Sequence, residues 1–101
     1  MYAVIWEYRV KEENRSEFEK AYSSNGAWAE LFRKGPGYIG TELLRSERES
    51  EIYTTIDRWE SKEAYERFLA EWQAEYKRLD ERCEGLTEYE NRLGGFTRVT
   101  P

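Results

Sequence analysis

Residues 52–65 read IYTTIDRWESKEAY, and this stretch decides the fold because it joins a strand to a helix. Between Ile52 and Trp59, β-branched and aromatic residues predominate, which predicts a strand. Ser61 then stands where a helix N-cap residue is expected. From Tyr65 onward, apolar side chains recur at three- and four-residue steps, which predicts a helix that packs one face on a sheet. They are Tyr65, Phe68, Leu69, Trp72, Tyr76, Leu79 and Cys83.

The same reading, extended in both directions, gives a complete domain. Alternating apolar residues predict further strands at residues 2–10, 38–45 and 86–93. A helix capped by Asn14 or Ser16, followed by a helical piece at residues 27–32, fills the gap between the first two strands. The order β-α-β-β-α-β predicts one α+β domain over residues 1–101, with a ferredoxin-like antiparallel sheet and both helical regions on one side.

The predicted third strand is apolar on both faces. Ile52, Thr54 and Ile56 lie on one face, and Tyr53, Thr55 and Trp59 lie on the other. Helices can cover only one face of this sheet, so the second face would be left exposed in a monomer. We therefore expect a homodimer in which two sheets pack against each other.

Composition excludes several classes of function. The net charge is −5, which argues against a nucleic-acid partner. The chain has no histidine, so a Ser-His-Asp triad, an HExxH zinc site and a histidine-ligated haem are all impossible, and no metal site is expected. Its single cysteine, Cys83, fits a reducing compartment. With neither a signal peptide nor a membrane-spanning run, the protein is expected in the cytoplasm.

Several segments, in order and suitably spaced, resemble a known family. They are Val10-Lys11, Glu17-Phe18, Gly35 to Tyr38, Glu42 to Ser46, and Asp57 to Tyr65. In these segments the chain is similar to the antibiotic biosynthesis monooxygenase family of the dimeric α/β-barrel superfamily. The resemblance implies a homodimer with sheets back to back and a cavity between each sheet and its own helices. Members include cofactor-independent oxygenases of phenolic compounds, haem-degrading enzymes and proteins of unassigned function.

The resemblance also implies a set of site residues. Trp59 matches a pocket tryptophan, Tyr65 matches a tyrosine of the phenol oxygenases, and Thr55 stands where those enzymes have an asparagine. Arg92 stands near a late arginine of the same enzymes. The haem-degrading branch has an axial histidine near the position of Leu69, so this branch is disfavoured. The resemblance thus implies a monooxygenase that needs no cofactor and acts on a small aromatic compound. The alternative is a dimeric protein of the same fold that binds such a compound without turning it over.

Each of these four residues also has a purely structural interpretation. Trp59 at a strand end can seal the core, and Tyr65 begins the apolar stripe of its helix. Thr55 suits a strand by propensity alone. Arg92, which is flanked by Glu88 and Glu90, can be a solvated cross-strand charge.

Asp57 is the remaining candidate, since a carboxylate two residues before Trp59 could act as a base. With Arg58 and Lys62 close in sequence, a surface ion pair or a role at the helix start is the simpler expectation. We also expect a largely apolar cavity between sheet and helices, because many large aromatic residues converge on one layer. Trp59 and Tyr65 should lie on its wall, with Thr55 nearby.

Overall fold

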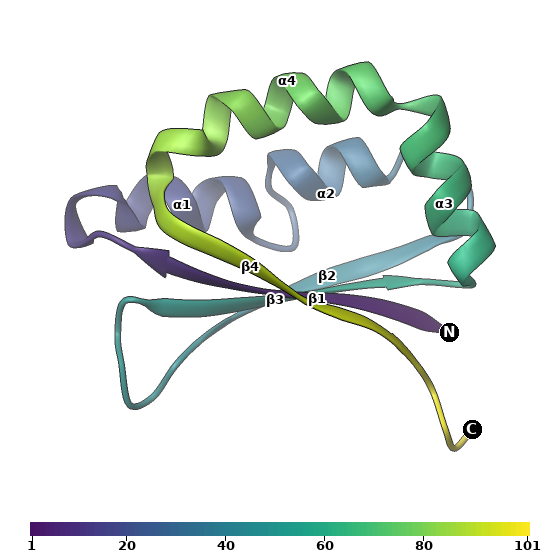
Figure 1. Cartoon of the computed structure of the whole chain (residues 1–101), viewed down its shortest axis with the longest axis horizontal. Helices are drawn as coiled ribbons and strands as arrows, with labels where there is room; N and C mark the ends of the chain where they lie inside the picture. The colour runs from purple at the N-terminus through teal and green to yellow at the C-terminus, as the bar shows by residue number, and fades with distance from the viewer.

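A computed structural model describes all 101 residues as one sheet with helices over one of its faces (Figure 1). The elements are β1 (Tyr2–Val10), η1 (Glu12–Asn14), α1 (Arg15–Tyr22), α2 (Ala27–Phe32), β2 (Tyr38–Arg45), β3 (Ile52–Trp59), α3 (Lys62–Glu71), α4 (Gln73–Cys83), η2 (Glu84–Leu86) and β4 (Thr87–Thr97). The four strands are antiparallel in the order β2-β3-β1-β4. The predicted ferredoxin-like fold is therefore confirmed. None of the helices has the length and apolar character needed to cross a membrane.

The second helical region begins as predicted but breaks in the middle. Ser61 is the N-cap of α3, where its hydroxyl oxygen accepts a hydrogen bond from the Ala64 backbone N–H at 3.0 Å. The helix is interrupted at Trp72, whose φ of −114° and ψ of 27° lie outside the helical region. Figure 1 shows α3 and α4 running in different directions on the two sides of this residue. The break allows one amphipathic segment to cover both the end and the middle of the sheet.

The last strand is longer than predicted because it passes through a β-bulge. Ile5 pairs with Gly94 and Trp6 pairs with Arg92, so Leu93 is an extra residue on β4. Gly94 has a φ of +146°, a conformation that side chains rarely adopt. The bulge places Arg92 opposite Trp6 and Glu90 opposite Tyr8, so these two residues lie on the face that the helices cover.

Aromatic rings dominate the core between the sheet and the helices. Tyr8, Tyr53 and Trp59 project from the strands and meet Phe18 and Phe68 from the helices, and all five side chains are buried. Centroids of neighbouring rings lie between 4.2 and 6.3 Å apart throughout this layer. Large rigid rings pack edge to face and leave gaps that smaller side chains would fill.

The opposite face of the sheet is uncovered, and it carries apolar side chains beside charged ones such as Arg58 and Glu42. Ile5 of β1 lies opposite Ile56 of β3, and both are partly exposed. The side chains of Leu44 on β2 and Phe96 on β4 are each 47% exposed. This open face is the one that we expect, from the sequence, to pack against the sheet of a second subunit.

Candidate active site

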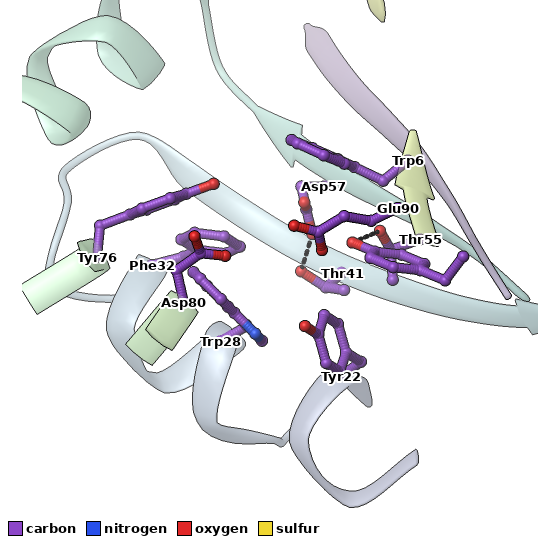
Figure 2. Close-up of a pocket in the computed structure, with 11 residues that line it drawn as sticks. Trp6, Tyr22, Trp28, Phe32, Thr41, Thr55, Asp57, Tyr76, Asp80 and Glu90 are labelled. Atoms are coloured by element: carbon purple, nitrogen blue, oxygen red, sulfur yellow. Dashed lines mark hydrogen bonds between the residues drawn. The ribbon is translucent and has the colours of Figure 1, made fainter. Parts of the chain in front are cut away.

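A cavity lies between the helix-covered face of the sheet and the helices α1, α2 and α4 (Figure 2). Its volume is small, about 30 Å³, so a ligand larger than a few water molecules would require the side chains at its wall or mouth to move. Every strand and three helices contribute to the wall. The lining residues are Trp6, Tyr8, Tyr22, Trp28, Phe32, Thr41, Thr55, Asp57, Tyr76, Asp80 and Glu90.

Asp57 is the buried charged group of the cavity. It lies on β3 opposite Thr41 of β2, and only 8% of its surface is exposed. The Thr41 hydroxyl donates a hydrogen bond of 2.7 Å to Asp57 Oδ1 and lies 2.7 Å from the Tyr38 hydroxyl. Burial raises the pKa of the Asp57 carboxyl to about 6, and the Thr41 hydrogen bond opposes this only partly. Asp57 is therefore a carboxylate that can take up a proton near neutral pH.

The expectation of a surface ion pair for Asp57 is wrong. Side chains alternate along β3, so Arg58 points to the open face, where it pairs with Glu42. Asp57 points the other way, into the cavity, and makes no salt bridge. Its neighbours in sequence are thus not its neighbours in space.

The hydroxyl groups of the cavity wall stay protonated. Tyr8 and Thr55 share a hydrogen bond of 3.1 Å between their oxygens, and both side chains are buried. Burial raises the pKa of Tyr8, Tyr22 and Tyr76 above the ordinary tyrosine value. The wall therefore offers neutral hydroxyl groups that can donate hydrogen bonds to an oxygen of a bound molecule.

Two further carboxylates mark the mouth of the cavity. Asp80 on α4 and Glu90 on β4 are exposed residues of the wall, and Figure 2 shows both carboxyl groups directed inward. Partial burial raises the pKa of Glu90, and the charges of Asp80 and Glu84 act in the same direction. The mouth is thus an acidic opening between α4 and β4.

Of the four residues carried over by resemblance, only Thr55 lines the cavity. Trp59 has no exposed surface and packs among aromatic rings, with its ring centre 5.8 Å from that of Phe32. The Tyr65 ring lies 5.7 Å from that of Trp59 and 5.8 Å from that of Tyr2, whose hydroxyl is 3.4 Å from Arg92 Nη2. The expectation that Trp59 and Tyr65 lie on the cavity wall is therefore wrong. Trp59, Tyr65 and Arg92 form a cluster around Tyr2, on the far side of Phe32.

Comparison with known proteins identifies the family. The family model for antibiotic biosynthesis monooxygenases matches residues 1–82. The chain belongs to the antibiotic biosynthesis monooxygenase family. The resemblance seen in the sequence is thereby confirmed. A search of curated protein sequences found no match.

Solved structures of antibiotic biosynthesis monooxygenases and related proteins share the fold over nearly the whole chain. A variant of SnoaB, a cofactor-independent oxygenase from Streptomyces nogalater, is 22% identical with a TM-score of 0.74, covering 99% of this chain and 94% of its own. A proposed monooxygenase of this family from Deinococcus radiodurans is 10% identical with a TM-score of 0.79, covering 100% and 95%. A variant of MhuD with two manganese protoporphyrin IX molecules bound per active site is 24% identical with a TM-score of 0.72, covering 100% and 97%.

Sequence reasoning within the antibiotic biosynthesis monooxygenase family missed most of the cavity wall. Strand alternation alone places Asp57 on the same face as Thr55 and Trp59, so the signal for Asp57 was present. Trp28 and Tyr76 carry the same periodic signal as ordinary core residues. Asp80 and Glu90 read as solvated charges. Only the tertiary structure shows that these residues meet at one cavity.

Proposed function

We propose that this chain is a cofactor-independent monooxygenase that oxidises a small phenolic compound in the cavity between sheet and helices. Membership of the antibiotic biosynthesis monooxygenase family supports the reaction class. The observation that carries the proposal is the Asp57 carboxyl, which is buried in a cavity where six of the eleven lining residues are aromatic. A titratable group held in such surroundings is typical of a site that moves a proton.

Asp57 acts in this proposal as the general base. The O–H bond of the phenol breaks, the proton goes to the free oxygen of Asp57, and the electron pair remains on the substrate oxygen. The Thr41 hydroxyl donates to Oδ1 and lies within hydrogen-bond distance of the Tyr38 hydroxyl, so these two groups hold the carboxyl in place and leave its other oxygen free to take the proton.

The electron-rich phenolate then reacts with dioxygen directly, so the protein supplies no redox group. One electron passes from the phenolate to dioxygen, and the two radicals combine at an activated carbon of the ring. One oxygen atom stays in the product, and the other leaves as water with two hydrogens from the substrate. The protein excludes bulk water and presents hydroxyl donors to the developing charge.

The four residues implied by the family resemblance have different places in this proposal. Thr55, with Tyr8, orients the substrate oxygen from within the cavity. Trp59 supports the wall from behind Phe32. Tyr65 and Arg92 would meet a substrate that extends past Phe32 towards Tyr2, and for these two the catalytic role rests on the resemblance alone.

We further propose that the chain works as a cytoplasmic homodimer. The open face of the sheet carries the apolar side chains of Ile5, Ile56, Leu44 and Phe96, which a second sheet would cover together with the neighbouring charged pair. Packing through this face leaves the helices and the mouth of the cavity free. The single reduced cysteine, Cys83, suits the cytoplasm.

A protein that binds the same class of compound without oxidising it is the second candidate. The observation in its favour is the position of Trp59, which is packed solidly outside the cavity. Three of the four residues that the resemblance associates with catalysis thus do not line the cavity described here.

Oxygen consumption separates the two candidates. The purified protein is incubated with anthrone-type and simple phenols, and dissolved dioxygen and product absorbance are followed together. The oxygenase predicts consumption above the uncatalysed rate, with one labelled oxygen atom in the product from ¹⁸O₂. Asp57→Asn should abolish it, and the exposed hairpin variant Glu47→Gln should not. Rates equal to the uncatalysed reaction for phenols that demonstrably bind would leave the binding protein as the better account.

A further inference from the structure

The charges in the cavity wall are all of one sign. Three of the eleven lining residues are acidic, Asp57, Asp80 and Glu90, and none is a lysine or an arginine. The chain as a whole has 16 basic and 21 acidic residues, so basic side chains were available for this wall and are absent from it. A wall of this kind opposes a bound anion and favours a bound cation.

Aromatic rings make up most of the remaining wall. Six of the eleven residues are Trp, Tyr or Phe, contributed by β1, α1, α2 and α4 (Figure 2). The face of an aromatic ring carries partial negative charge and attracts an ammonium group within about 6 Å of its centre. Aromatic rings combined with carboxylates are the typical surroundings of organic cations in proteins.

Asp57 has no positively charged partner within the protein. Its side chain is more than nine-tenths buried, and only Oδ1 receives a hydrogen bond, from Thr41. The other groups of the cavity wall that carry a side-chain oxygen are hydroxyls and acids, among them Thr41 from β2, Tyr8 from β1, Glu90 from β4 and Tyr76 from α4. A buried carboxylate without a cation is costly, and a positively charged ligand would supply the missing partner.

The approach to the cavity is acidic as well. A groove between α4 and β4 adjoins the mouth and shares Asp80 and Glu90 with it. It adds Glu81, Glu84 and Glu88, with Lys77 as its single basic residue. This groove attracts cations towards the opening before any contact is made. No three acidic side chains are close enough together to hold a metal ion, so the charge distribution suits an organic cation better than a metal.

We infer that the cavity takes an organic cation, namely an aromatic ring that bears a protonated amine. The ring lies among the aromatic side chains, and the ammonium group meets Asp80 and Glu90 at the mouth or Asp57 within. As an account of the substrate, this rests on the proposed function, because it makes the phenol an amine-bearing one. The positive charge of the amine then offsets the acidic wall, which would otherwise oppose formation of the phenolate.

Three probes that share one ring and differ in charge test this inference. They are 4-hydroxyphenethylamine, which is cationic, 4-ethylphenol, which is neutral, and 3-(4-hydroxyphenyl)propionate, which is anionic. Binding to the purified protein is measured by calorimetry at neutral pH and low salt. We expect the cation to bind about tenfold more tightly than the neutral phenol, and the anion to bind most weakly. Equal affinities, a preference for the anion, or no binding of the cation would overturn the inference.

Matched variants assign the effect to the carboxylates. Asp80 and Glu90 are exposed, so the variants Asp80→Asn and Glu90→Gln should fold normally. Each should weaken binding of the cationic probe and leave the affinity for 4-ethylphenol unchanged. Asp57→Asn should do the same if the amine reaches the interior. Glu47→Gln, in the hairpin away from the cavity, is the control and should change nothing. Variants that bind all three probes more weakly by the same factor, or that bind all three as tightly as the parent protein, would count against the inference.

The binding test does not depend on whether the protein oxidises the molecule that it binds. Selective binding of the amine without oxygen consumption would retain the inference and remove the oxygenase. Oxygen consumption with neutral or anionic phenols alone would retain the oxygenase and remove the inference.

Discussion

Replacing Asp57 by asparagine should make the protein more stable at neutral pH. The folded carboxyl has a pKa of about 6, compared with an ordinary value of 3.8. Below pH 3.8 the carboxyl is protonated in both states and its burial has no ionic cost. As pH rises from about 3.8 to 6, the carboxyl ionises in the unfolded chain before it does so in the folded protein, and the free energy of unfolding falls by about 3 kcal/mol. Asparagine stays neutral and can still accept the Thr41 hydrogen bond. Asp57→Asn should therefore gain up to about 3 kcal/mol at pH 8 and almost nothing near pH 4.

Urea unfolding, followed by circular dichroism at a fixed protein concentration between pH 4 and pH 8, measures this difference. Fixed concentration matters because unfolding of a dimer depends on it. Glu47→Gln serves as the control, since its carboxyl is exposed in the β2–β3 hairpin and its removal should not change the pH dependence. A variant that is less stable than the parent at pH 8, or a difference that does not vary with pH, would show that Asp57 is held by favourable contacts. A gain in stability with loss of oxygen consumption would identify Asp57 as a group retained for function.

Three further substitutions test other parts of the account. Ile56→Asp places a charge on the open face, so sedimentation equilibrium should show monomers, and an intact dimer would argue against packing through this face. Trp59→Ala should cost about 3–5 kcal/mol in urea unfolding, because the side chain is completely buried, and a loss near zero would contradict its role in the core. Tyr65→Phe should leave the unfolding free energy within about 1 kcal/mol. Any oxygenation rate should nevertheless fall, and an unchanged rate would set Tyr65 aside as a catalytic residue.

The sequence was sufficient for the fold because its local signals agree with one another. Alternation along β3 separates Ile56 from Thr55 and Trp59, and Ser61 marks the start of the following helix. The misreading of Asp57 came from giving sequence neighbours more weight than this alternation. Arg58 is adjacent in sequence, but a strand sends adjacent side chains to opposite faces.

Other features have no local signal in the sequence. No glycine or proline marks the helix break at Trp72, where the chain bends to follow the sheet. The cavity is set by packing among seven elements, so Trp28 and Tyr76 look like core residues until the gap between them is seen. The mouth of the cavity has no local signal in the sequence either, because Asp80 and Glu90 are ten positions apart and lie on different elements.

The bulge at Leu93 has a consequence for how proteins of this shape can diverge. Because of this one extra residue, Glu90 and Arg92 face the helices, whereas an uninterrupted strand in the same register at Gly94 would turn both towards the open face. Gain or loss of one residue at an edge strand disturbs little of the core. Such a change would nevertheless exchange the charges at the cavity mouth for those of the neighbouring positions in a single step. Ligand preference can therefore change abruptly between relatives whose backbones superimpose closely.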